Sequence, residues 1–318
     1  MTNIGWVGVG AMGRPMAATF AASGVKIRAF DSNRHQLEGI EELNIEAASS
    51  ADRVAKDADI LVIMVATPAQ GEEVLFGEHG GAAHLRSGTV VVVMSTVGPD
   101  AVIRWSTALA SLGVELVDAP VSGGVARAAS GELLTMVGGS SAALARVQGI
   151  LDVLSRSVVV AGPLPGDGQR MKLVNQLLCG VHIAVAAEAL GFAEALGLDV
   201  KAAWEVVRQG AASSFMLEDR GERMTDGAFE DVKSAVNIFV KDMNLVGVAA
   251  HDATYPTPIA SAAEQLYLMA SRAGLGSLDD SVVIEVARGA LDRWTRPFDA
   301  DETTKLEGES TRAHGEHS

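Results

Sequence analysis

Residues 5–17 read GWVGVGAMGRPMA and combine a short apolar run with three glycines, Gly8, Gly10 and Gly13. The apolar run predicts a β-strand, and the following AMGRPMAATFAAS predicts a helix that ends at Gly24. The spacing Gly-x-Gly-x-x-Gly between a strand and a helix is typical of a turn whose backbone N–H groups bind a pyrophosphate. The spacing alone also fits an ordinary strand–turn–helix connection, so the surrounding sequence must decide between the two.

An acidic residue, Asp31, follows Gly13 by 18 residues at the end of the next predicted strand, VKIRAFD. This completes the dinucleotide-binding pattern, in which the first glycine makes the turn, the second admits the phosphates and the third packs helix on strand. Asp31 would accept hydrogen bonds from the ribose hydroxyls and repel a 2′-phosphate, which favours NAD over NADP. Arg34 keeps NADP open as the less favoured cofactor, although a solvated helix start is the simpler explanation of this arginine. The predicted cofactor-binding residues of the loop and strand end are Gly8, Gly10, Ala11, Met12, Gly13 and Asp31.

Strands and helices alternate through the first half of the chain. The runs ILVIMVA (60–66) and TVVVVMS (89–95) are continuous and β-branched, as is typical of strands buried on both faces of a parallel sheet. GVELVDAPV (113–121) and SVVVAG (157–162) predict two further strands. This alternation predicts the α/β fold class, with a doubly wound parallel sheet of the Rossmann type.

The pattern changes after GPLPGDG (162–168), beyond which Ala, Leu, Glu and Met dominate. The stretch from Gln169 to Gly197 predicts one long helix, and several others follow up to about residue 296. We therefore predict three parts. They are a NAD-binding Rossmann domain at 1–165, an all-helical substrate and oligomerisation domain at 166–296, and a flexible acidic tail at 297–318.

Composition excludes several classes of function. The formal net charge of −15 argues against nucleic acid or an anionic membrane as a partner. The single cysteine, Cys179, excludes an intrachain disulfide and a multi-cysteine zinc site, and we predict no metal site. The apolar segment 173–198 carries Asn175, Gln176, His182, Glu188 and Glu194, so we expect a buried helix of a soluble protein rather than a membrane span. With no export signal apparent, the expected location is the cytoplasm.

Residue spacing also excludes two dehydrogenase mechanisms. The Tyr-x-x-x-Lys pair of short-chain dehydrogenases is missing, because Tyr255 and Tyr267 are followed at that spacing by Ile259 and Ser271. A zinc alcohol dehydrogenase needs cysteine ligands that this chain lacks. Cys179 fits a small buried hydrophobe better than a covalent nucleophile.

A lysine remains as the candidate for proton transfer. Lys172 lies in GDGQRMKLVNQ, at the start of the long helix, where a cleft between two domains would form. Lys172, Asn175 and Gln176 are spaced to lie on one helix face. Beside a positively charged nicotinamide ring the ammonium form is disfavoured, which lowers the lysine pKa and suits it to take the hydroxyl proton. From position alone, a surface lysine on an amphipathic helix is the other interpretation of this residue.

Four blocks of sequence resemble the β-hydroxyacid dehydrogenase family, which includes 3-hydroxyisobutyrate dehydrogenase and tartronate semialdehyde reductase. The resemblance covers about residues 4–295. The blocks are GWVGVGAMGRPMA, similar to the cofactor signature, DAPVSGGVARAASGELLTMVGG (118–139), similar to the substrate block, GDGQRMKLVNQ, similar to the catalytic-lysine block, and FVKDMNLV (239–246), similar to the late Lys-Asp cofactor block.

The resemblance implies roles for particular residues. Lys172 would be catalytic, and Ser122, Gly123 and Gly124 would bind the substrate carboxylate. Asn175 and Gln176 would orient the substrate, although some relatives carry two asparagines here. Thr96 would approach the nicotinamide ribose and Lys241 would close over the cofactor. The resemblance also implies a homodimer or homotetramer formed through the helical domain.

Within this family the segments VNQLLCGVHIAVAAEALGFAEALGLD, SSFMLEDR (213–220) and SAVNIFVKD (234–242) look most like the L-threonate dehydrogenase branch. That branch oxidises a polyhydroxylated four-carbon acid to its 2-oxo form. Ser213, Ser214 and Arg220 offer polar groups to such a substrate, but the same residues fit helix caps and surface decoration. VATPAQ and Phe215 depart from the branch pattern.

Three other functions stay open beside an NAD-dependent dehydrogenase of threonate. Two are enzymes of the same family, a 3-hydroxyisobutyrate dehydrogenase and a 2-hydroxy-3-oxopropionate (tartronate semialdehyde) reductase. The third is a non-catalytic nucleotide-binding module, which the presence of Lys172 argues against.

Overall fold

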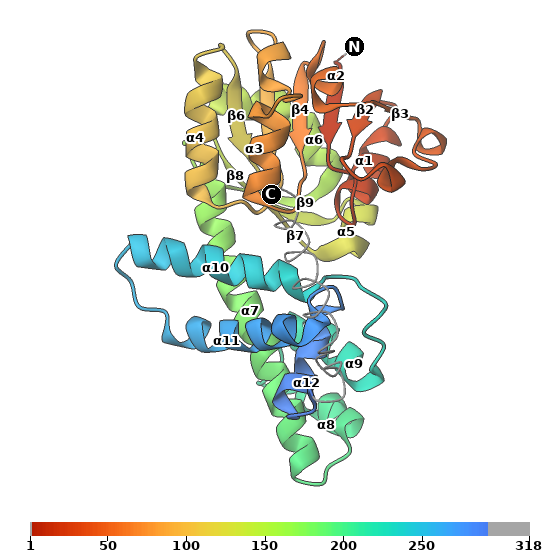
Figure 1. Ribbon diagram of the computed structural model, residues 1–318, viewed down its shortest axis with the longest axis vertical. Coiled ribbons are helices and arrows are strands. Elements are labelled where there is room, and N and C mark those ends of the chain that lie inside the picture. Colours follow the sequence, from red (N-terminus) through yellow and green to blue (C-terminus); the bar gives the residue numbers. More distant parts are fainter. Residues whose placement is uncertain (1, 292–318) are drawn as a thin grey trace, which may run out of the picture.

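The computed structural model describes residues 2–291, so the predicted acidic tail at 297–318 and the last residues of the predicted helical domain lie outside the described part. Figure 1 shows two structurally different parts along the long axis of the molecule. A sheet covered by helices forms one end, and a group of helices around the long helix α7 (Asp167–Ala195) forms the other. The predicted α/β fold with a following helical part is confirmed.

The first six strands form a parallel sheet. Their pairing is fixed by aligned apolar residues, since Val7 pairs with Phe30 on one side and with Ile63 on the other. The strand order reverses between β1 and β4, which is the switch point where open α/β sheets bind ligands. In spatial order the strands are β3 (Ile45–Ala47), β2 (Ile27–Phe30), β1 (Ile4–Val7), β4 (Ile60–Ile63), β5 (Val90–Val93) and β6 (Glu115–Asp118).

Three more strands make the far end of the sheet mixed. β8 (Leu133–Gly138) runs antiparallel to β6 and to β7 (Val121–Ser122), and it runs parallel to β9 (Ser155–Gly162). The connection between β7 and β8 is too short for a right-handed crossover, which needs a dozen or more residues, so the chain returns antiparallel. The fully parallel arrangement expected from the sequence therefore holds only for the first six strands.

Helices cover both faces of the sheet and enclose two apolar cores. Trp6 is fully buried in one core and Trp105 in the other. The covering helices are α1 (Gly13–Ala21), α2 (Ala51–Ala55), α3 (Pro68–Phe76), α4 (Pro99–Ala110), α5 (Gly124–Ser130) and α6 (Ser141–Leu154), with 3-10 turns η1 (Arg34–Leu37), η2 (Glu41–Leu43) and η3 (Ala82–His84).

The helical part is built around α7, which contacts α9, α10, α11 and α12. Its core includes Tyr267, which stacks on Phe239 and donates a hydrogen bond from its hydroxyl to the Gly180 carbonyl at 2.7 Å. The elements after α7 are α8 (Val200–Val207), α9 (Phe215–Asp226), α10 (Val236–Asp252), α11 (Pro258–Ala270), the π-helical turn η4 (Ser271–Leu275), η5 (Asp280–Val282) and α12 (Val283–Ala287).

α7 has the length and the mean hydropathy, 1.5, of a membrane-spanning helix. Its packing gives the opposite interpretation, because its buried residues include Gln169, Lys172 and Gln176 and four other helices cover it. α7 is therefore the central helix of the helical part, with polar residues among its buried positions as expected.

Candidate active site

The glycine loop joins β1 to α1 at the switch point of the sheet. Gly8 has φ +93°, and a side chain there would begin 2.3 Å from the Met64 carbonyl oxygen. A Cβ on Gly13 would lie 2.0 Å from the Gly8 carbonyl oxygen, so α1 can start this close to β1 only with glycine. A Cβ on Gly10 would meet no atom of the described chain within 4 Å. Gly8 and Gly13 thus allow the turn, and Gly10 leaves open space where a phosphate group fits.

Ala11 and Met12 complete the turn before α1. Met12 is the N-cap residue, and its side chain makes no capping hydrogen bond. The Arg14 N–H donates to the Gly10 carbonyl at 3.0 Å and Pro15 has no N–H, so in the first turn of α1 the Gly13 N–H is left to a ligand or solvent. Asp31 follows β2 directly, and its carboxylate accepts hydrogen bonds from the N–H of Val9 at 2.9 Å and of Asn33 at 2.9 Å. These bonds fix the acidic side chain beside the glycine loop, which is the placement that the dinucleotide pattern requires.

Lys172 lies in the second turn of α7 and is only 6% exposed. Burial is the main cause that lowers its pKa below the ordinary lysine value, and nearby Lys241 lowers it further, whereas Asp242 acts in the opposite direction. Within residues 2–291, the Lys172 amine has no hydrogen bond or ion pair to another side chain or carbonyl. A buried lysine whose amine lacks a hydrogen bond is typical of functional sites, and among the described residues the fully buried side-chain oxygen without a hydrogen bond is Oδ1 of its neighbour Asp242.

Asp242 is the buried acid whose charge has the largest effect on the Lys172 amine. It is 2% exposed, accepts a short hydrogen bond from Gln176 Nε2, and forms an ion pair with Lys241, whose Nζ lies 2.8 Å from Asp242 Oδ1. Lys241 Nζ also donates to the Thr96 carbonyl at 2.8 Å. The structure therefore brings Thr96 and Lys241, 145 positions apart in the chain, into direct contact beside Lys172.

Asn175 and Gln176 lie on α7 one turn after Lys172. Asn175 Nδ2 donates to Gln176 Oε1 at 2.9 Å and to Cys179 Sγ at 3.3 Å. Burial raises the pKa of the Cys179 thiol, which keeps it protonated and argues against a nucleophilic role. Cys179 is half-buried and packs against the helical core, so the expectation of a small buried residue is met only in part.

Ser122, Gly123 and Gly124 form the turn between β7 and α5. Gly123 has φ +142° and Gly124 has φ +72°, backbone conformations that residues other than glycine rarely adopt. No hydrogen bond among the described residues joins this turn to Lys172 or Asn175. A second link between the two halves lies nearby, since the Arg127 guanidinium on α5 stacks 5.2 Å from the centroid of the Phe215 ring on α9.

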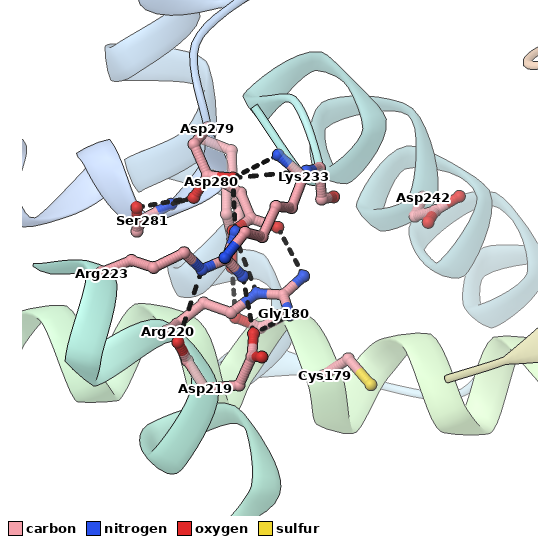
Figure 2. A network of polar contacts seen from close by, with 12 residues as sticks. Cys179, Gly180, Asp219, Arg220, Arg223, Lys233, Asp242, Asp279, Asp280 and Ser281 are labelled. Atoms are coloured by element: carbon pink, nitrogen blue, oxygen red, sulfur yellow. Dashed lines mark hydrogen bonds and ion pairs between the residues drawn. The ribbon is translucent and has the colours of Figure 1, made fainter. Parts of the chain in front are cut away.

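The polar residues 213–220, considered as contacts for a hydroxylated substrate, have partners within the fold. Ser214 caps α9 by accepting from the Leu217 N–H at 3.1 Å, and Ser213 donates to Glu218. Arg220 belongs to an ion network, defined by Asp219, Arg220, Arg223, Asp279 and Asp280. Figure 2 shows both arginines between Asp219 and the two other acids, with Cys179 of α7 close by. These contacts favour the helix-cap interpretation that the sequence left open.

Sequence patterns do not identify three buried polar residues near Lys172, namely Asp242, Asp118 and Gln169. Asp242 was visible as the residue after Lys241 in FVKDMNLV. Asp118 ends the buried strand β6, and Gln169 lies three residues before Lys172, and both side chains are fully buried. A carboxylate directly after an apolar strand was the available signal for Asp118, whereas Gln169 had none.

The chain matches two family descriptions in tandem. Residues 3–162 match the NAD binding domain of 6-phosphogluconate dehydrogenase. Residues 166–287 match the NAD-binding domain of NADP-dependent 3-hydroxyisobutyrate dehydrogenase.

Individual proteins agree with these matches. The L-threonate dehydrogenase of Escherichia coli K12 is 38% identical over 288 residues, covering 90% of this chain and 95% of that protein. The 2-hydroxy-3-oxopropionate reductase of the same strain is 32% identical over 285 residues, covering 89% and 96%. The crystal structure of a 3-hydroxyisobutyrate dehydrogenase from Salmonella typhimurium superposes with a TM-score of 0.85 at 38% identity, covering 90% of this chain and all of that one.

These findings confirm the family resemblance, the nicotinamide cofactor and the enzyme class expected from the sequence. They favour an enzyme over the alternative of a non-catalytic nucleotide-binding module. The chain belongs to the β-hydroxyacid dehydrogenase family, in its 3-hydroxyisobutyrate dehydrogenase-like group, and is an NAD-binding oxidoreductase that acts on a hydroxyl group.

Proposed function

We propose that this enzyme oxidises L-threonate to its 2-oxo acid with NAD, and that Lys172 is its general acid and base. The observation that carries the catalytic part is the buried Lys172 amine, which has no hydrogen-bond partner among residues 2–291 and lies beside the Lys241–Asp242 pair. The choice of substrate is supported by several L-threonate dehydrogenases at 37–38% identity, compared with 32% for the hydroxyoxopropionate reductase.

The glycine loop fits a dinucleotide. The space beside Gly10 and the uncapped start of α1 suit the two phosphates, and the fixed carboxylate of Asp31 suits the ribose hydroxyls. Thr96 and Lys241, which contact one another, would hold the nicotinamide end. A bound NAD would supply the hydride acceptor for oxidation of the carbinol carbon.

Lys172 performs the proton transfer that accompanies this step. Burial lowers its pKa, so a larger fraction of the amine is neutral at working pH and able to accept the hydroxyl proton. In the reverse direction the ammonium returns that proton. Asp242 limits the lowering of the pKa, because its negative charge favours the protonated form.

The substrate would be held from both halves of the chain. Ser122, Gly123 and Gly124 present a hydroxyl and backbone N–H groups in a turn, a pattern that suits a carboxylate. Asn175 and Gln176 present amide groups on the Lys172 face of α7, where they would orient the substrate hydroxyls. We assign these five residues to substrate binding.

Turnover of a substrate panel tests the proposed substrate. We expect the highest kcat/KM on L-threonate with NAD, at least tenfold above 3-hydroxyisobutyrate and glycerate, since a site that hydrogen-bonds hydroxyls rejects analogues that lack them. NADP should be the poorer cofactor on every substrate. A protein that turns over 3-hydroxyisobutyrate or reduces tartronate semialdehyde, but leaves threonate unchanged, would overturn the substrate assignment and leave the family unaffected.

We also propose the division into a Rossmann domain at 1–165 and a helical domain at 166–296. Support comes from the apolar cores, because the two sheet cores end at Leu154 and the helical core begins at Leu173. A cytoplasmic location suits this enzyme, because oxidation depends on a supply of NAD and the single thiol forms no disulfide within the chain.

A second copy of this chain is the proposed partner of α7. One face of this helix exposes large apolar side chains at intervals of three, four and seven residues, which suits packing against another helix. The exposed residues are Met171, Val174, Leu178, Val185 and Phe192. Light scattering should give at least a dimer for the parent protein and a smaller species for Val185→Glu, whereas a monomeric parent protein would contradict the proposal.

A further inference from the structure

We propose that Asp118 and Gln169 form a clamp that holds the start of α7 against the ends of β5 and β6 and thereby sets the position of Lys172. Both would be positioning residues, since neither is proposed to touch substrate or cofactor. The inference rests on the proposed role of Lys172, and its test is chosen so that the two can fail separately.

Asp118 supplies the missing cap of α7. It is the last residue of β6 and is fully buried, while the N-cap position of α7, Gly166, has no side chain to offer. Asp118 Oδ1 accepts the Gly166 N–H at 2.9 Å, and Asp118 Oδ2 accepts the Gln169 N–H at 2.7 Å. A carboxylate at a helix N-terminus also interacts favourably with the helix dipole. The first turn of α7 is therefore fastened to a strand of the other half of the molecule.

Two glycines allow the backbone to approach the Asp118 carboxylate closely. A Cβ on Gly138 would begin 2.5 Å from Asp118 Oδ1, and a Cβ on Gly168 would begin 2.9 Å from Asp118 Oδ2. The two glycines come from β8 and from α7 itself. A side chain at either glycine would collide with the carboxylate, so the two N–H bonds to Asp118 depend on glycine at both positions.

Gln169 fastens the same turn to a second strand end. Its Oε1 accepts the N–H groups of Val97 at 3.0 Å and Gly98 at 3.1 Å, and its Nε2 donates to the Ser95 carbonyl at 2.9 Å. The side chain is fully buried, and all three bonds go to one loop that follows β5. A buried amide with this many partners has a single orientation.

The clamped loop contains Thr96, whose carbonyl accepts the hydrogen bond from Lys241. The nicotinamide side of the site and the lysine helix are thus joined twice, through Gln169 on α7 and through Lys241 on α10. Lys172 follows Gln169 by less than one helical turn, so a shift of the first turn moves the amine with it. A displacement of about 1 Å between reacting groups lowers rates by about 100-fold.

Kinetics of Gln169→Ala and of the isosteric Gln169→Met test the clamp. We expect kcat to fall about 10- to 100-fold, with KM for the hydroxy acid and Kd for NADH within about twofold of the parent values. The primary deuterium isotope effect on kcat should rise, because the chemical step becomes slower than product release. Gln169→Glu, which keeps acceptors for Val97 and Gly98, should recover part of kcat.

Gln148→Ala is the matched control, because Gln148 is an exposed residue of α6 and, among the described residues, its side chain bonds to exposed Asp152 alone. Asp118→Asn keeps one acceptor oxygen and should lower kcat in the same way as Gln169→Met. If the Gln169 variants fold and retain parent kcat, or if none of the clamp variants folds, then these residues serve stability alone and the inference fails. If Lys172→Ala also retains parent kcat in the same assay, the proposed role of Lys172 fails instead.

Discussion

Two buried polar sites of the helical half differ in whether their charged groups are paired. In the ion network, Asp279 and Asp280 are fully buried, and each is paired with an arginine, Arg223 or Arg220 (Figure 2). In the lysine site, the Lys172 amine is almost as buried but has no hydrogen bond among residues 2–291. Paired charges join α9 to η5 and support the fold, whereas an unpaired amine costs stability, as is typical of a group with the role proposed for Lys172.

The largest effect on stability should come from breaking the ion network. Arg223→Ala removes the cation paired with buried Asp279 and should lower the free energy of unfolding by about 3–5 kcal/mol, measured by urea denaturation. The control is Arg28→Ala, which breaks the exposed Arg28–Glu46 pair and should cost less than about 1 kcal/mol. Equal losses of unfolding free energy in the two variants would show that burial does not decide how much an ion pair contributes to stability.

Asp118 is an intermediate case, a buried acid bound by backbone N–H groups without a cation. Burial raises its pKa to about 6, so the folded state binds this proton more tightly than the unfolded state, whose pKa is near 3.8. The contribution of this protonation to the free energy of unfolding is therefore fully present below pH 3.8 and is lost as pH rises through about 6.

Replacing Asp118 by Asn should remove that dependence. Between pH 4 and pH 7, the difference in unfolding free energy between parent and Asp118→Asn should change by up to about 3 kcal/mol, the parent losing more as pH rises. Urea denaturation at several pH values measures the difference. A difference that is constant over this range would contradict the raised pKa.

The smallest stability effect concerns the lysine itself and has the opposite sign. Lys172→Met should raise the free energy of unfolding at pH 7 by about 1–3 kcal/mol, because an unpartnered buried amine is replaced by an apolar chain of similar length. The folded-state pKa is lowered, so the unfolded chain binds the proton more tightly and the gain should shrink as pH approaches 10.5. A variant less stable than the parent at pH 7 would place Lys172 with the structural charges.

The sequence predicted the parts of the site that depend on local pattern. The glycine loop, Asp31 and the helix that carries Lys172 follow from spacing and periodicity over short stretches, and α7 spans Asp167–Ala195 where a helix over 169–197 was expected. Apolar runs likewise predicted β4 and β5 at their observed places.

Contacts between distant segments could not be predicted in this way. Asp118 bonds to residues 48 and 51 positions away, and Gln169 bonds to a loop more than 70 positions earlier. Nothing in the local sequence of a single glutamine distinguishes a fully bonded, buried amide from a solvated one. The mixed end of the sheet also escaped prediction, because the strand direction of β8 is set by the length of its connection.

The most direct test of the central claim compares hydride transfer and cofactor binding in Lys172→Ala. We predict that kcat for the hydroxy acid falls by about 10²–10⁴-fold, the usual contribution of a general acid–base group, while Kd for NADH stays within about twofold of the parent. Lys201→Ala, at an exposed lysine paired with Asp226, should change neither value. Turnover near the parent rate in Lys172→Ala would contradict the account.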